Sequence, residues 1–124
     1  MKVCITSQGD TLQSGVDPRF GRCSWFIMVD PDSMDFEAVK NPMGESAGGA
    51  GIQAGQMMAD KDVDVVLTGN VGPNAFQTLK AAKIILVTGV SGSVEEALEM
   101  YKKGKFQTTE NPTVESHAGM KGEV

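Results

Sequence analysis

The 124-residue sequence lacks three features that would assign it to common classes of protein. No apolar run approaches the roughly 20 residues that a membrane-spanning helix needs. There is no excess of basic residues, because 11 Lys and Arg stand against 16 Asp and Glu for a net charge of −5, and a nucleic-acid binder needs a basic face. We expect no secretory leader, because the first residues, Met1 to Ile5, lead straight into an expected strand. We therefore expect a cytoplasmic protein that binds neither membranes nor nucleic acids.

Residues with catalytic chemistry are also scarce. The chain has one histidine, His117, and two cysteines, Cys4 and Cys23, which form no CxxC motif. It has no P-loop motif, no serine in a nucleophile elbow, and no carboxylate in the first expected strand to hold catalytic metal ions. These absences favour a binding protein over an enzyme.

Glycine, in contrast, is abundant, with 15 residues grouped in short clusters. Such clusters indicate tight loops where backbone approaches backbone or a ligand. The length and the apolar fraction of 40% predict a single domain with a real core. We place this domain at residues 1–107 and expect residues 108–124, which are polar and unpatterned, to form a partly ordered tail.

The stretch over residues 62–89 is the clearest structural pattern. Val63 to Leu67 and Ile84 to Val87 are apolar runs that predict two buried strands. Between them, Gly69-Asn70-Val71-Gly72-Pro73-Asn74 is a loop, and a helix follows whose apolar stripe is Ala75, Phe76, Leu79 and Ala82. A helix between two strands makes the strands parallel.

The rest of the pattern completes an α/β fold. Residues 2–6 predict a strand, and residues 23–30 and 34–40 predict an antiparallel hairpin. A second helix is expected from about Gly49 to Asp60, with an inward face of Gly51, Ile52, Gly55, Met58 and Ala59. Ser93-Val94-Glu95-Glu96 is a capping box that opens a third helix. The prediction is a mixed five-stranded sheet, antiparallel on one side and parallel on the other, with about three helices.

Two glycine-rich loops are candidate ligand sites. The loop over residues 69–74 leaves the carboxyl end of a parallel strand, where open α/β sheets bind ligands. Gly49-Ala50-Gly51-Ile52-Gln53-Ala54 fits a relaxed dinucleotide pattern, but a long loop precedes it where that motif needs a strand. A glycine-rich helix start packed on the sheet explains it equally well. Its N–H groups would still favour an anion.

The sequence Arg19-Phe20-Gly21-Arg22-Cys23 ends the first long loop and allows two interpretations. The arginines could neutralise an anionic ligand or form a surface pair, and Cys23 could bind a soft metal or lie in the core. Cys4, in the middle of a strand, suits the core better. His117 could supply one metal ligand or could be solvated in the tail.

Three stretches together resemble the dinitrogenase iron–molybdenum cofactor family. They are Asp17-Pro18-Arg19-Phe20-Gly21-Arg22-Cys23, Gly48-Gly49-Ala50-Gly51-Ile52, and Gly69-Asn70-Val71-Gly72-Pro73-Asn74-Ala75-Phe76. The resemblance covers about residues 2–105. It implies a ribonuclease H-like fold without nuclease activity. It also implies binding of an anionic metal–sulfur cluster, either the iron–molybdenum cofactor, a precursor of it, or a molybdenum–copper sulfide cluster.

The resemblance also suggests which residues hold the cluster. The implied cluster-binding residues are Arg19, Phe20, Gly21, Arg22, Gly48, Gly49, Ala50, Gly51, Gly69, Asn70, Gly72, Pro73 and Asn74, and the candidate metal ligands are Cys23 and His117. Members from nitrogen-fixing systems often have histidine where this chain has Arg19, so direct ligation from that position is lost. A carrier of this kind implies a protein that donates or accepts the cluster.

Two alternatives to a cluster carrier stay open at this stage. One is a regulatory or partner-binding domain that has kept the fold and lost the cluster. The other is an enzyme acting on a nucleotide or phosphate ligand, which only the glycine-rich helix start supports.

Overall fold

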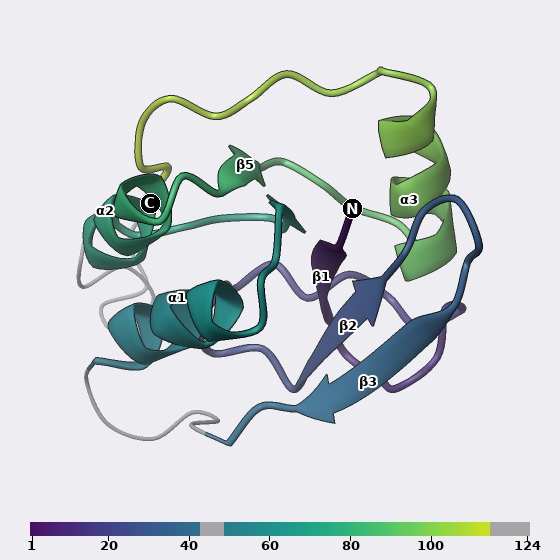
Figure 1. The fold of residues 1–124 in the computed structure, drawn as a ribbon, viewed down its shortest axis with the longest axis horizontal. Coiled ribbons are helices and arrows are strands. Elements are labelled where there is room, and N and C mark those ends of the chain that lie inside the picture. The colour runs from purple at the N-terminus through teal and green to yellow at the C-terminus, as the bar shows by residue number, and fades with distance from the viewer. Residues whose placement is uncertain (43–48, 115–124) are drawn as a thin grey trace.

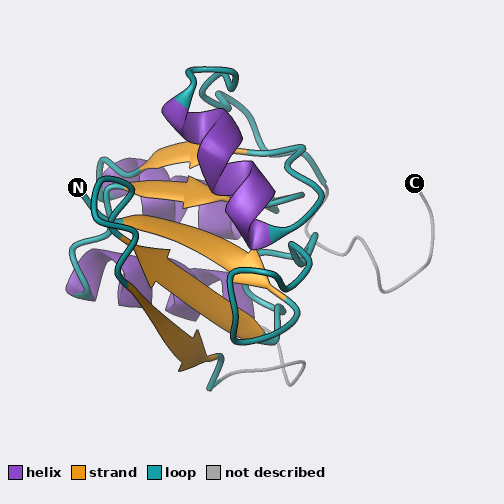
Figure 2. Cartoon of the chain, turned by 90° about the vertical axis from the view of Figure 1, so that its right-hand side faces the viewer, coloured by secondary structure: helices purple, strands orange, loops and turns teal. Residues whose placement is uncertain are grey.

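The computed structural model describes residues 1–42 and 49–114, in which one mixed sheet lies between two layers of helices (Figures 1 and 2). Helices α1 and α2 cover one face of the sheet, and α3 covers the other. None of the helices in these ranges is long and apolar enough to cross a membrane. The elements in chain order are β1 (Val3–Ser7), β2 (Trp25–Val29), β3 (Phe36–Lys40), α1 (Ala50–Asp60), β4 (Val65–Leu67), α2 (Pro73–Ala81), β5 (Ile85–Val87) and α3 (Val94–Lys102).

The sheet confirms the predicted mixture of antiparallel and parallel pairing. Its strand order is β3-β2-β1-β4-β5. The β2–β3 hairpin pairs antiparallel to β1 through β2, while β4 and β5 lie parallel to β1 on its other side. The carboxyl ends of β1, β4 and β5 therefore meet at one edge of the sheet.

Successive side chains of the central strands point to opposite faces of the sheet, so the core consists of two layers. Cys4 and Val66 point to the face that α1 and α2 cover. Val3, Ile5 and Leu67 point to the face that α3 covers. All five are completely buried, as expected for strands with helices on both sides.

The start of α3 agrees with the sequence in detail. The Ser93 hydroxyl accepts a hydrogen bond from the Glu96 N–H (3.0 Å), and the Glu96 carboxylate accepts one from the Ser93 N–H (2.9 Å). This reciprocal capping box satisfies two N–H groups that a helix start leaves without partners.

The predicted inward face of α1 was partly wrong. Ile52 is 38% exposed and Ala59 is also exposed, whereas Ala50, Ala54, Gly55 and Met58 are buried. The reason is that α1 packs against α2 as well as the sheet: Gly51 and Gly55 face α2, and this turns Ile52 outward.

The strand β5 and the end of α2 also differ from the prediction. Ile85 is 44% exposed because β5 is the last strand of the sheet and only three residues long. Ala82 is exposed because it is the C-cap of α2 and lies beyond the packed stripe of Ala75 and Leu79.

After α3 the chain returns across the molecule to the α2 side, along the top of Figure 1. We call residues 108–114 the C-terminal strap. The N–H of Thr109 donates to the Leu86 carbonyl of β5 (2.7 Å), and the N–H of Thr113 donates to the Val71 carbonyl (2.9 Å). The part of the predicted tail up to Val114 is thus hydrogen-bonded to the domain, and residues 115–124 lie outside the described ranges.

Candidate functional site

Two of the predicted loops pair with each other at the carboxyl ends of β1 and β4. The loop over residues 17–23 follows β1, and the loop over residues 69–74 follows β4. The N–H of Asn70 donates to the Pro18 carbonyl (2.8 Å), and the N–H of Phe20 donates to the Asn70 carbonyl (3.2 Å). This short parallel bridge between residues 19 and 70 fixes the two loops side by side.

Close backbone approaches explain two of the glycines. A Cβ on Gly69 would lie 2.6 Å from the Cα of Pro18, which is too close for any residue with a side chain. Gly21 has a φ of +95°, and a Cβ there would lie 3.0 Å from the Cα of Gly51 in the first turn of α1. The first loop therefore contacts both the 69–74 loop and the start of α1. We call this meeting place of three segments the site edge.

The starts of α1 and α2 lie side by side at the site edge. A Cβ on Gly51 would be 3.1 Å from the Cβ of Ala75, and one on Gly55 would be 2.7 Å from the Cγ2 of Thr78. These contacts advance together along both helices, so the helices run parallel. Both N-caps are glycines, Gly49 and Gly72, without a side-chain cap, and neither first turn contains an acidic residue. Two adjacent helix starts of this kind attract negative charge.

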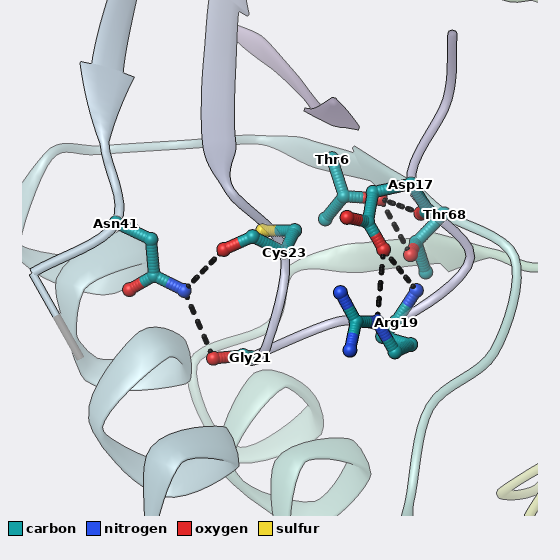
Figure 3. A network of polar contacts seen from close by, with 7 residues as sticks. All are labelled: Thr6, Asp17, Arg19, Gly21, Cys23, Asn41 and Thr68. Carbon is teal, nitrogen blue, oxygen red and sulfur yellow. Dashed lines mark hydrogen bonds and ion pairs between the residues drawn. The ribbon is translucent and has the colours of Figure 1, made fainter. Parts of the chain in front are cut away.

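A buried polar network lies at the ends of β1 and β4 (Figure 3). The Thr6 hydroxyl donates to the Asp17 carbonyl (2.6 Å) and lies 2.7 Å from the Thr68 hydroxyl. Asp17 is buried, and its carboxylate accepts hydrogen bonds from the N–H (3.0 Å) and the Nε (3.3 Å) of Arg19. The two strand ends thus carry neutral hydroxyl groups, and the one carboxylate beside them is paired with an arginine.

Cys23 lies in the core below the site edge rather than on its surface. Its side chain has no exposed area, and Asn41 supports its backbone by donating to the carbonyls of Gly21 (3.0 Å) and Cys23 (2.8 Å) (Figure 3). Burial, with a smaller contribution from the Asp17 charge, raises the pKa of the Cys23 thiol to about 12. Burial also raises the pKa of Cys4 well above its usual range. Both thiols are free and protonated at neutral pH, which fits the core interpretation of Cys23.

The remaining predicted residues divide into surface and core. The surface residues are Arg19, with 47% of its side chain exposed, Asn70 and Asn74. The half-buried residues are Arg22, Gly72 and Pro73. Phe20 is buried and packs edge-on against Phe26, with ring centroids 6.1 Å apart, so it positions the loop from below. Gly48 and His117 lie outside the described residues. Within residues 1–42 and 49–114, no group of three His, Cys, Asp or Glu side chains could hold a metal ion.

The structure adds site-edge residues that the sequence analysis did not select. Asp17 has a recognisable signal, because an Asp whose carboxylate accepts from the N–H two residues later forms a common turn. Thr6, Thr68, Asn41 and Thr113 have no local signal. Their partners are separated from them by 18 to 62 residues, apart from the Thr6 bond to Asp17.

The strand order and the helix arrangement define a ribonuclease H-like α/β domain. Residues 1–104 match the protein family described as "Dinitrogenase iron-molybdenum cofactor". The chain therefore belongs to the dinitrogenase iron–molybdenum cofactor family, as its motifs suggested.

Solved structures support the same assignment. The chain is similar to the apo form of the orange protein from Desulfovibrio gigas, with 36% identity, a TM-score of 0.88, and coverage of 91% of this chain and 96% of the orange protein. It is also similar to TM1290 from Thermotoga, a candidate NifB protein, with 35% identity, a TM-score of 0.77, and coverage of 91% and 98%. Among curated proteins, uncharacterized protein MJ0580 from Methanocaldococcus jannaschii is 24% identical over 113 residues, which is 89% of this chain and 92% of the relative.

Proposed function

We propose that this protein binds and carries an anionic metal–sulfur cluster at the site edge. The parallel starts of α1 and α2 carry the proposal, because they place two uncapped sets of N–H groups next to each other. Family membership and the similarity to the orange protein support a metal–sulfur cluster as the anion. The cluster would be cargo, so we assign the protein no catalytic role.

In this proposal the backbone supplies most of the contacts. The N–H groups of residues 50–52 in α1 and of residues 74–75 in α2 have no partners within their helices and can donate to the sulfides of a cluster, whereas Pro73 has no N–H. In this proposal Arg22 and Arg19 add positive charge at the site edge. Arg19 shares its charge with Asp17 through a 3.3 Å ion pair, so we assign Arg22 the larger electrostatic contribution.

Direct bonds from protein to metal are a separate part of the proposal. Because the Cys23 thiol is buried and protonated, it could bind a metal only if the 17–23 loop moved. His117 stays a candidate ligand. The contacts at the site edge favour a cluster held mainly by hydrogen bonds and charge.

The proposal can be tested by anaerobic reconstitution with tetrathiomolybdate, with and without copper or iron. Visible absorption and elemental analysis after desalting would measure the retained cluster. We expect about one cluster per chain, and a loss of about 10- to 150-fold in affinity for Arg22→Gln, because one charge–anion contact contributes about 1.5–3 kcal/mol. Arg19→Gln should have a smaller effect.

Lys102→Gln is a matched control, because it removes one positive charge from the exposed end of α3. If Lys102→Gln weakened retention as much as Arg22→Gln, net charge rather than the site edge would be responsible. A wild-type protein that stayed colourless and metal-free would contradict the proposal and favour the partner-binding alternative.

A further inference from the structure

The C-terminal strap is hydrogen-bonded to the site edge at the backbone of Val71. The N–H of Val71 donates to the Thr113 hydroxyl (2.9 Å), and the Val71 carbonyl accepts from the N–H of Thr113 (2.9 Å) and of Val114 (3.3 Å). The Cγ2 of Val114 also lies 4.0 Å from the position of a Cβ on Gly72, the N-cap of α2. The strap thus reaches the start of α2 from a place more than 40 residues along the chain.

Val71 is held from three directions. Its side chain is buried in the core between the sheet and the two parallel helices. The preceding residue, Asn70, is bonded on both its N–H and its carbonyl to the 17–23 loop. The strap satisfies the N–H and carbonyl of Val71 itself. The next residue, Gly72, opens α2, so the direction of the first turn of α2 depends on how Val71 is held.

We propose that Thr113 and Val114 are positioning residues that fix the first turn of α2 in the geometry that receives the cluster. This inference rests on the proposed function. It adds that the site is completed by a segment beyond residues 1–104, the part of the chain that matches the family. An N–H donor that is preorganised toward an anion needs no rearrangement when the anion binds. Loss of the strap contact should therefore weaken binding without removing any group that touches the cluster.

The strap provides its own matched control. Thr109 and Thr113 each accept a hydrogen bond of 2.9 Å from a backbone N–H, that of Thr88 and that of Val71 respectively. Thr109 fastens the strap to the residue after β5, whereas Thr113 fastens it to the site edge. Valine at either position keeps the shape and removes the hydroxyl. Each variant also loses a second hydrogen bond, which joins Thr109 to the Thr88 hydroxyl (2.8 Å) and Thr113 to the Val71 carbonyl (3.3 Å).

The experiment compares wild type, Thr113→Val, Thr113→Ser and Thr109→Val after reconstitution with tetrathiomolybdate and copper. Two quantities are measured, the rate at which the bound cluster is lost during dilution and the hydrogen exchange of backbone amides in residues 70–76. We expect Thr113→Val to release the cluster at least fivefold faster and to speed exchange at Val71 and at Phe76, whose N–H donates to the Gly72 carbonyl at the start of α2 (3.0 Å). Thr113→Ser keeps the hydroxyl, so its cluster release and its amide exchange should match those of the wild type. Thr109→Val should change cluster release by less than twofold.

The outcomes separate this inference from the proposed function. If Thr109→Val and Thr113→Val accelerated release equally, or if Thr113→Val altered exchange but not release, the strap would be merely structural and the inference would be overturned. If the wild type held no cluster, the proposed function would fail. Exchange would then decide alone: faster exchange at Phe76 in Thr113→Val but not in Thr109→Val would support the positioning role, and equal exchange would overturn it.

Discussion

The three helices of this domain begin in two different ways. At the start of α3, the Ser93 and Glu96 side chains cap the N–H groups, and Glu95 and Glu96 supply negative charge. At the starts of α1 and α2, the N-caps are glycines, no side chain caps them, and no acidic residue lies in the first turn. The difference separates a helix start that is complete in itself from two that leave donors available for an external anion.

The positions of the three helices give this difference its meaning. The uncapped starts lie together at the site edge, in contact with the 17–23 loop. The capped start belongs to α3, which covers the other face of the sheet. Local capping is therefore present at the start of α3 and absent where we propose that the cluster binds.

The largest expected effect comes from breaking the loop contact that supports α2. Gly69→Ala would place a Cβ 2.6 Å from the backbone of Pro18, and overpacking against backbone should lower the free energy of unfolding by about 3 kcal/mol. Urea denaturation would measure the change.

Gly89→Ala is the control for that substitution. Gly89 has a φ of +75° but nothing within 4 Å of its Cβ position, so its substitution should cost only about 1 kcal/mol from backbone strain. Equal losses for the two variants would show that the two loops tolerate separation.

A pH-dependent effect concerns the thiols beneath the site edge. The folded-state pKa of Cys23 is about 12, above its ordinary value of 9.0, so the folded chain retains a proton that the unfolded chain releases. Stability from this group is fully present below pH 9 and falls between pH 9 and 12, by about 1.4 kcal/mol per pH unit. Cys4 acts in the same direction.

Thermal denaturation from pH 7 to pH 10.5 would measure this loss, with Cys23→Ala as the comparison. That variant should lose less stability per pH unit than the wild type. In the native wild type, both thiols should react with Ellman's reagent no faster than global unfolding allows. Rapid reaction of Cys23 at pH 7 would show that its thiol is accessible and would support Cys23 as a direct metal ligand.

The smallest effect should come from making α2 more like α3. Asn74→Asp adds a carboxylate at the exposed position of the first turn of α2, and this should raise stability by about 0.5 kcal/mol through the helix dipole. The same charge should repel an anionic cluster and weaken its retention severalfold in the tetrathiomolybdate assay.

Ser93→Ala makes the reverse change at the other kind of helix start. It removes the cap of α3 and should lower stability by about 1 kcal/mol while leaving cluster retention unchanged. If Asn74→Asp left retention unchanged as well, the start of α2 would not be part of the site.

Much of the fold was predictable because its signals are local. The apolar runs around Val66 and Leu86, the hairpin and the Ser93–Glu96 capping box each act over a few residues, and the mixed sheet is confirmed. The errors at Ile52 and Ile85 arose where a neighbour decides burial. Ile52 turns outward because α1 also packs on α2, and Ile85 is exposed because β5 is an edge strand.

The candidate site was predictable as a set of segments but not as a set of contacts. The two glycine-rich stretches and the Arg19–Cys23 stretch are the three segments that meet at the site edge. The Arg19 pairing with Asp17 and the Thr113 pairing with Val71 were missed. A bond between a threonine and a backbone group 42 residues away leaves no pattern in the sequence, since only the folded chain brings the two together.

The close approach of α1 and α2 at Gly51 and Gly55 has an energetic consequence for the protein without its ligand. Two parallel helices present like-signed ends to each other, so their dipoles repel. Glycine permits this spacing. A bound anion would attract both positive helix ends, so the repulsion between them would be replaced by a shared attraction that links α1 and α2. The melting temperature should then rise with cluster occupancy, and loading of the carrier would also be a change in its rigidity.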